Sequence, residues 1–265
     1  MSDNPYAPPE ADVTPVPSGS TAVGGTGDFS IGQSFSDAWA AMWAGFPLWL
    51  GFGVVASIAF GLSAMTVIGL FLAWPGLVYG ATLFLLRLHD GDAALGDLWE
   101  GFRTYTPTTL NGLGLGLLLV LLTYVGQIPV LVATVVDSTG ALVVAQFVNF
   151  VWAFVLVRFY FALFLWVDQG FGPTEALQGS WRMTGPVFWK MVGLMFLLSA
   201  LMLPGILAAL VTVLPAVATD TAGFGVVAAV GGILAVVLVS AASVLGYLMF
   251  ASAYRQVAGR PGGGH

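Results

Sequence analysis

The sequence lacks cysteine altogether and carries very little charge. Its 265 residues include no Cys, 7 Lys or Arg and 13 Asp or Glu, so that charged residues make up only 8% of the chain. The absence of Cys excludes disulfides, thiolate metal sites and a cysteine nucleophile. Soluble domains are about 25% charged. With 58% hydrophobic residues, the composition therefore excludes a water-soluble fold and predicts an all-α, polytopic integral membrane protein.

The composition divides the chain into three parts. Residues 1–28 contain five Pro and four acids but no Lys or Arg, and such a segment cannot bury enough apolar surface to fold. We expect a disordered acidic tail over 1–28, a six-helix membrane domain over 29–258, and a flexible C-terminal tail over 259–265.

Six apolar segments are long enough to cross a bilayer, which takes about 20 residues of helix. They cover residues 47–63, 66–88, 107–136, 141–167, 186–214 and 226–254. Pro75, Pro129 and Pro204 fall inside three of them and are the expected kink points, because proline lacks a backbone donor.

A short amphipathic stretch precedes every second span. The stretches cover residues 31–46, 93–105 and 173–184, and a span then begins at Pro47, Pro107 or Pro186. Their apolar residues recur at helical spacing, which predicts three helices lying in the membrane interface. Five side chains represent these interfacial helices: Trp39, Trp99, Trp181, Arg103 and Arg182. The unit of one interfacial helix and one hairpin occurs three times. This reflects either true internal homology or the separate use of one arrangement at three places in the chain.

The positive charges predict the orientation. Arg and Lys gather near the interfacial helices and the termini, whereas the loops at 63–66, 137–140 and 215–225 contain none. By the positive-inside rule, the N- and C-termini are expected in the cytoplasm, with the protein in the cytoplasmic (inner) membrane of a bacterium.

Arg158 is the one full charge well inside a predicted span, and an intramembrane charge is a candidate functional residue. Its expected partners are backbone carbonyls, Tyr124, Thr123, Gln127, or the rings of Phe154 and Phe161. Gln146 and Asn149, one turn apart, could line a polar seam with Gln127, although interhelical hydrogen bonding is the commoner role of such residues. The candidate intramembrane polar site is thus Arg158, Gln127, Gln146, Asn149 and Tyr124.

Other motifs are weak. His89, Asp90 and Asp92 superficially resemble a metal site, but one His with two loop carboxylates is a poor ligand set, and Asp92 is more typical of a helix cap. The glycines at 112/116 and 76/80 indicate close helix approach rather than phosphate binding. We find no catalytic, cofactor-binding or metal site, and the few basic residues argue against nucleic-acid binding.

One segment resembles a known family. Residues 157–160 and 168–185, with the runs Val157-Arg158-Phe159-Tyr160 and Gly172-Pro173-Thr174-Glu175-Ala176-Leu177, are similar to the membrane domain fused to some glycerophosphoryl diester phosphodiesterases and found in related six-helix bacterial proteins. The opening Asn4-Pro5-Tyr6-Ala7-Pro8-Pro9 is similar to tails of that group. The resemblance covers the membrane domain only, so it implies a six-helix layout and no hydrolase activity.

The sequence therefore favours a non-enzymatic membrane protein that organises lipids or partner proteins at the cytoplasmic face. Membrane lipids, a partner protein or a second copy of the chain are the expected partners, with no cofactor. The alternative is a small transporter or channel that uses Arg158 in a central polar site. A third possibility is an accessory subunit of a larger complex.

Overall fold

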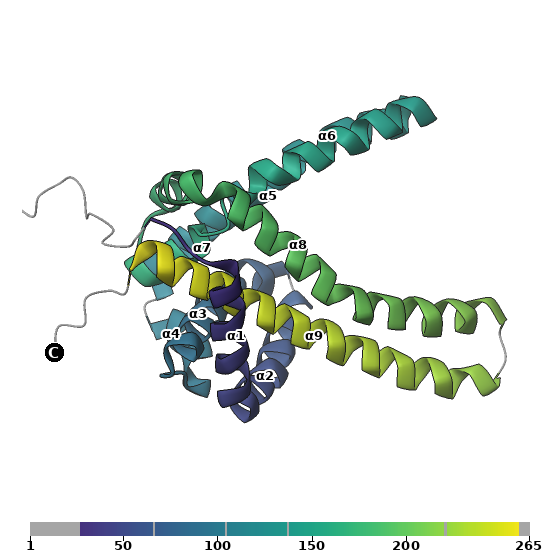
Figure 1. The fold of residues 1–265 in the computed structure, drawn as a ribbon, viewed down its shortest axis with the longest axis horizontal. Helices are drawn as coiled ribbons and strands as arrows, with labels where there is room; N and C mark the ends of the chain where they lie inside the picture. Colours follow the sequence, from purple (N-terminus) through teal and green to yellow (C-terminus); the bar gives the residue numbers. More distant parts are fainter. Residues whose placement is uncertain (1–26, 66, 104, 137, 220–221, 260–265) are drawn as a thin grey trace, which may run out of the picture.

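The computed structural model describes residues 27–65, 67–103, 105–136, 138–219 and 222–259. Within these ranges every regular element is a helix, which confirms the all-α prediction (Figure 1). The elements are α1 Ile31–Ala44, α2 Phe46–Ala64, α3 Val67–Asp90, η1 Leu95–Trp99, α4 Glu100–Arg103, α5 Tyr105–Val136, α6 Thr139–Val157, α7 Ala162–Gln169, α8 Pro173–Thr219 and α9 Ala222–Ala258. The two tails predicted at 1–28 and 259–265 lie almost wholly outside the described residues.

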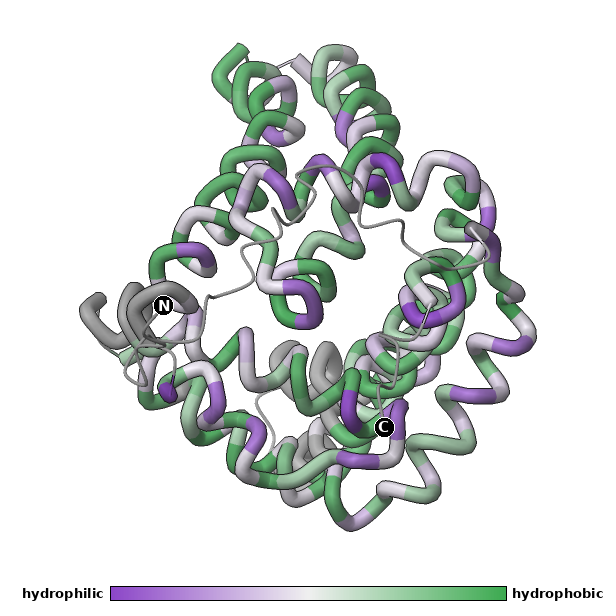
Figure 2. Tube along the Cα trace, turned by 90° about the vertical axis from the view of Figure 1, so that its left-hand side faces the viewer, coloured by the Kyte–Doolittle hydropathy of each residue, from purple (hydrophilic) through white to green (hydrophobic). Residues whose placement is uncertain are grey.

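Among the described residues, four segments are long and apolar enough to cross a membrane: Thr108–Val136, Thr139–Gln169, Pro173–Val211 and Val230–Ala258. A fifth would be α1 with α2, which meet at an angle of 83° at Gly45. In each of the first three segments only 11% of the most hydrophobic window is buried by the rest of the chain. Such apolar surface is untenable in water, so these helices indicate a membrane-embedded protein. Figure 2 shows the same excess of hydrophobic residues along the trace.

The buried core lies where α3, α7 and the C-terminal half of α9 meet. Fully buried members include Phe84 of α3, Leu165 of α7 and Leu248 of α9. The hairpins α5–α6 and α8–α9 extend from this core as two arms, with their tips pointing away from α7 (Figure 1). The arms are therefore exposed to the surrounding solvent or lipid, whereas the core end is packed.

Several elements differ from the sequence prediction. Neither predicted span at 47–63 and 66–88 is by itself among the four candidate spans of the described residues, and the predicted interfacial helix at 93–105 is two short pieces, η1 and α4. The predicted interfacial segment 173–184 and the span at 186–214 form one continuous helix, α8, because Pro186 does not interrupt it. Figure 1 shows α8 changing direction near its N-terminal end, which the missing proline donor permits. The predicted single span at 141–167 is broken: α6 ends at Val157, and α7 begins at Ala162.

The prediction of close helix approach is confirmed at Gly76, Gly80 and Gly112 but not at Gly116. A Cβ on Gly80 would lie 2.1 Å from the carbonyl oxygen of Leu98, so α3 and η1 approach backbone to backbone there. In the same contact between helices, the ring of Phe102 lies against Gly76. The ring of Trp166 lies against Gly112. Gly116 meets nothing within 4 Å. The residues at 76 and 80 thus serve helix packing, as expected.

Candidate functional site

The break between α6 and α7 is the most unusual local feature of the described chain. From Arg158 to Ala162 the backbone hydrogen bonds span three residues instead of four; Tyr160 N–H, for example, donates to the carbonyl of Val157 at 3.3 Å. Three consecutive aromatic residues follow Arg158, and aromatic side chains lose rotamer freedom in a helix. The tighter turn leaves polar backbone groups without partners inside their own helix.

The hydroxyl groups of two α8 residues form hydrogen bonds with these backbone groups. Ser180 accepts a hydrogen bond from the Phe161 N–H at 3.1 Å and donates one to the Arg158 carbonyl at 2.7 Å. Thr184 donates to the same carbonyl at 3.1 Å. Both hydroxyl residues are fully buried, so their bonds replace those that the α-helix would have made.

The guanidinium of Arg158 lies over two aromatic rings of α8. Its central carbon is 5.0 Å from the Trp181 ring and 4.8 Å from the Phe188 ring. A Cβ on Gly185 would come 3.3 Å from one guanidinium nitrogen, so the glycine leaves room for the arginine. The partners expected from the sequence, Phe154 and Phe161 among them, are not the rings that the guanidinium covers; the correct rings lie on a neighbouring helix.

The predicted polar site is brought together only in part. Gln127 of α5 donates to Asn149 of α6 at 3.3 Å, and this bond ties the two helices together. Gln146 and Tyr124 are exposed. Arg158 lies nine residues beyond Asn149, or about 13 Å along a helix. The arginine and the amide pair are therefore separate features.

A second polar cluster, which the sequence analysis did not anticipate, joins the ends of α3, α7 and α9. Arg255 donates to Asp168 at 2.8 Å and to Asp90 at 2.7 Å. Tyr254 also donates to Asp168, at 2.8 Å, and His89 contacts Asp90 at 3.2 Å. The side chain of Arg255 is only 10% exposed, so this is an internal ion-pair network.

The charge state of Asp90 follows from that network. Burial alone would raise the pKa of its carboxyl, but the hydrogen bond from His89 and the charge of Arg255 together lower it. A lowered pKa means that the network stabilises the fold above pH 4 or so and loses this contribution as the pH falls through the lowered value.

The residues predicted for the interfacial helices lie on exposed surfaces. Trp39, Trp99 and Trp181 are 46%, 49% and 45% exposed. Arg103 pairs with Glu100 at 2.9 Å, and Arg182 is exposed. Trp181 has a second role, because Arg158 covers its ring.

The motif at His89, Asp90 and Asp92 falls within the described ranges. There, no three residues of the His, Asp and Glu type gather closely enough to hold a metal ion. Asp92 does not cap η1; the N-cap is Ala94, whose N–H donates to Asp97 at 2.8 Å.

Comparison with protein-family models, with curated proteins and with solved structures found no match. The class of protein is therefore defined by the fold itself: an all-α protein whose long apolar helices indicate a place in a membrane.

We predict that Ser180→Ala will lower the free energy of unfolding by about 1–3 kcal/mol, because the Phe161 N–H is left buried without a partner. Denaturant titration in detergent measures this. Ser243→Ala is the matched control: its hydroxyl donates to the carbonyl of Val239 in its own helix at 2.7 Å, and a change within about 0.5 kcal/mol is expected. Equal effects of the two substitutions would contradict the assigned role of Ser180.

Proposed function

We propose that this chain is a multi-pass protein of the bacterial inner membrane that organises lipids, or a partner at the lipid surface, on the cytoplasmic face, without catalysing a reaction. The observation that carries the proposal is a repeated pattern of tryptophans. Trp39, Trp99 and Trp181 are about half exposed, and each follows a fully buried residue: Ala38, Leu98 and Ser180. One side of each segment is thus fixed to the core, while its tryptophan faces outward, as an interfacial anchor does.

The basic residues support one orientation for all these elements. Arg87 pairs with Asp97, Lys190 pairs with Asp28, and Arg255 joins the network at the end of α9. The hairpin tips, by contrast, have no Lys or Arg in the sequence. We therefore place the packed end and both termini in the cytoplasm. In this proposal α2 and α3 cross the membrane as well, which gives six spans.

The proposal includes no chemical step because the polar groups described above are engaged in structural roles. Ser180 and Thr184 satisfy the helix break, and Asp168 and Asp90 share Arg255. The partners proposed are membrane lipids together with a protein partner or a second copy of the chain.

The test uses the purified full chain in nanodiscs of bacterial phospholipid. We expect Trp39→Ser with Trp99→Ser to reduce the phospholipid that stays with the protein on mild detergent extraction at least twofold, because the two interfacial anchors are lost. Tyr124→Ser is the control, since this exposed aromatic side chain lies on α5, outside the three interfacial segments. Unchanged lipid retention in the double variant, with the fold intact, would refute the proposal.

The transporter alternative is favoured by one specific observation, the broken helix at Arg158–Phe161, because substrate sites of many transporters lie at discontinuous helices. A cavity of about 610 Å³ adjoins the break, but its lining is mainly aromatic and aliphatic, including Trp74, Leu119 and Phe250. Flux of small anions into vesicles that is abolished by Arg158→Leu would select this alternative. No flux with the wild-type protein would eliminate it.

A further inference from the structure

We propose that the groove between α6 and α8 binds one anionic phospholipid, with its phosphate at Arg158 and an acyl chain along the groove. This inference rests on the proposed function and names the lipid class and the site.

Charge is the first argument. Arg158 is half-buried, and none of the ion pairs found in the described part of the chain includes it. The rings of Trp181 and Phe188 hold the group on one side and contribute no negative charge. A guanidinium beside the membrane hydrocarbon needs a counter-charge, and a phosphate accepts its paired donors in a bidentate manner.

Shape is the second argument. An apolar groove of about 160 Å³ begins at Val157, the residue before Arg158 on α6, and at Val192, one helical turn beyond Phe188 on α8. It continues to Phe150 on α6 and Ser199 on α8, away from Arg158 along both helices. From Val192 to Ser199 a helix rises about 10 Å, roughly two thirds of the half-thickness of about 15 Å that one leaflet contributes to the hydrocarbon core. The groove thus matches the part of one acyl chain that is nearest the headgroup.

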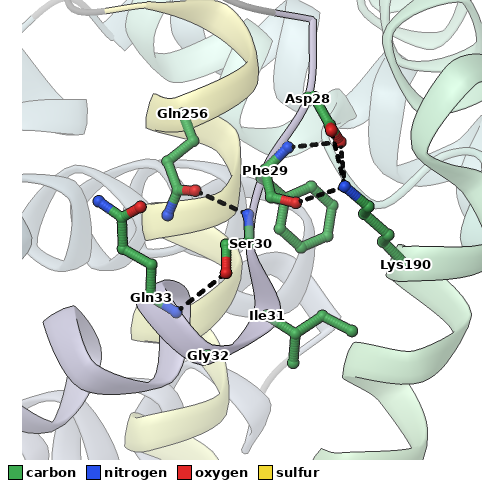
Figure 3. A pocket seen from close by; sticks show the side chains of 8 residues that line it. All are labelled: Asp28, Phe29, Ser30, Ile31, Gly32, Gln33, Lys190 and Gln256. Carbon is green, nitrogen blue, oxygen red and sulfur yellow. Dashed lines mark hydrogen bonds and ion pairs between the residues drawn. The ribbon is translucent and has the colours of Figure 1, made fainter.

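The depth of Arg158 in the membrane also matches that of a lipid headgroup. Lys190, two residues after Phe188, donates to the Phe29 carbonyl at 3.0 Å and to Asp28 (Figure 3). The N–H of Ser30, the residue after Phe29, donates to the side-chain oxygen of Gln256 on α9 at 3.0 Å. These residues line an open polar hollow near the end of α9. Arg158 packs against α8 on the N-terminal side of Lys190, so its guanidinium lies at headgroup level rather than at the bilayer centre.

Lys190 does not compete for the same phosphate, because it is paired with the carboxylate of Asp28. The Lys190 ammonium, through its hydrogen bond, holds the pKa of Asp28 below its ordinary value, so this carboxylate stays charged at neutral pH. Arg158, which follows Val157 of the groove directly, is therefore a cation available to a phosphate there.

The experiment measures lipid selectivity of the full chain in nanodiscs of phosphatidylcholine containing phosphatidylglycerol. We expect native mass spectrometry to show one phosphatidylglycerol retained by the wild type, with a preference of about tenfold over phosphatidylcholine, the factor that one charge-assisted contact supplies. Arg158→Gln should abolish the preference and Arg158→Lys should keep part of it. Lys190→Gln is the control, because that lysine is 44% exposed and is paired with Asp28.

Two further experiments distinguish a lipid phosphate from free phosphate and test whether the groove is needed. Inorganic phosphate at millimolar concentration should not displace the lipid, since it cannot use the groove; displacement would show an anion site without lipid specificity. Ala153→Trp fills the groove from α6 and should reduce lipid retention several-fold with Arg158 intact.

Unchanged preference in Arg158→Gln, or unchanged retention in Ala153→Trp, would overturn the inference. If Arg158→Gln fails to fold, the Arg158→Lys and Ala153→Trp variants test the inference in its place. The two proposals fail separately: a lipid effect of the Trp39/Trp99 variant without an Arg158 effect refutes only the lipid site, and the reverse result refutes only the interfacial role.

Discussion

Replacing Arg255 by Met is expected to lower the free energy of unfolding by about 3–5 kcal/mol. The substitution removes the shared partner of Asp168 and Asp90 and leaves two carboxylates at the end of the core without their cation. Unfolding of the purified protein in detergent, followed by tryptophan fluorescence, measures the loss.

Two controls make this prediction specific. Arg103→Met removes an exposed pair with Glu100 on one helical turn and should cost less than about 0.5 kcal/mol. Adding Asp168→Asn to Arg255→Met should recover part of the lost stability, because one uncompensated charge disappears. A cost of Arg255→Met no larger than that of Arg103→Met would mean that the network contributes nothing to the fold.

Gly80→Ala is expected to cost about 3 kcal/mol or more. The added methyl group would meet the backbone of Leu98, with contacts from 2.1 Å, and backbone atoms cannot rotate out of the way. The packing of η1 on α3 would have to loosen, together with the contact of Gly101 with the Gly76 carbonyl.

Gly53→Ala is the matched control for this glycine. It makes the same chemical change inside α2, but an added Cβ there meets nothing within 4 Å. Because alanine is the better helix former, this variant should be neutral or more stable by up to about 1 kcal/mol. The two thermal unfolding curves should therefore move in different directions, and parallel shifts would contradict the close packing of α3 and η1.

Hydropathy predicted the helical class and the positions of the long helices. The segment predicted at 107–136 is α5, Tyr105–Val136, because about 20 apolar residues are needed to cross a bilayer and few other folds need such runs. The pairing of Gln127 with Asn149 was also anticipated as one possibility, since both are isolated polar residues in neighbouring apolar helices.

The rest depended on contacts between distant residues. The apolar run around Arg158 is continuous, so no local pattern predicts a break there; the hydroxyl groups that stabilise it are 19 to 26 residues further along the chain. Asp168 and Arg255 are 87 residues apart, and periodicity contains no information about such pairs. The sequence therefore singled out Arg158 as a residue but not the rings that hold it.

The hydrogen bonds between α8 and the break between α6 and α7 have a consequence for biosynthesis. When α6 and α7 leave the ribosome, the Phe161 amide has no partner until Ser180, 19 residues further along the chain, has also emerged. At about 5–20 residues per second this takes roughly one to four seconds. During that interval the Phe161 amide lacks its final partner, so the α6–α7 segment acquires its final shape only when α8 packs against it.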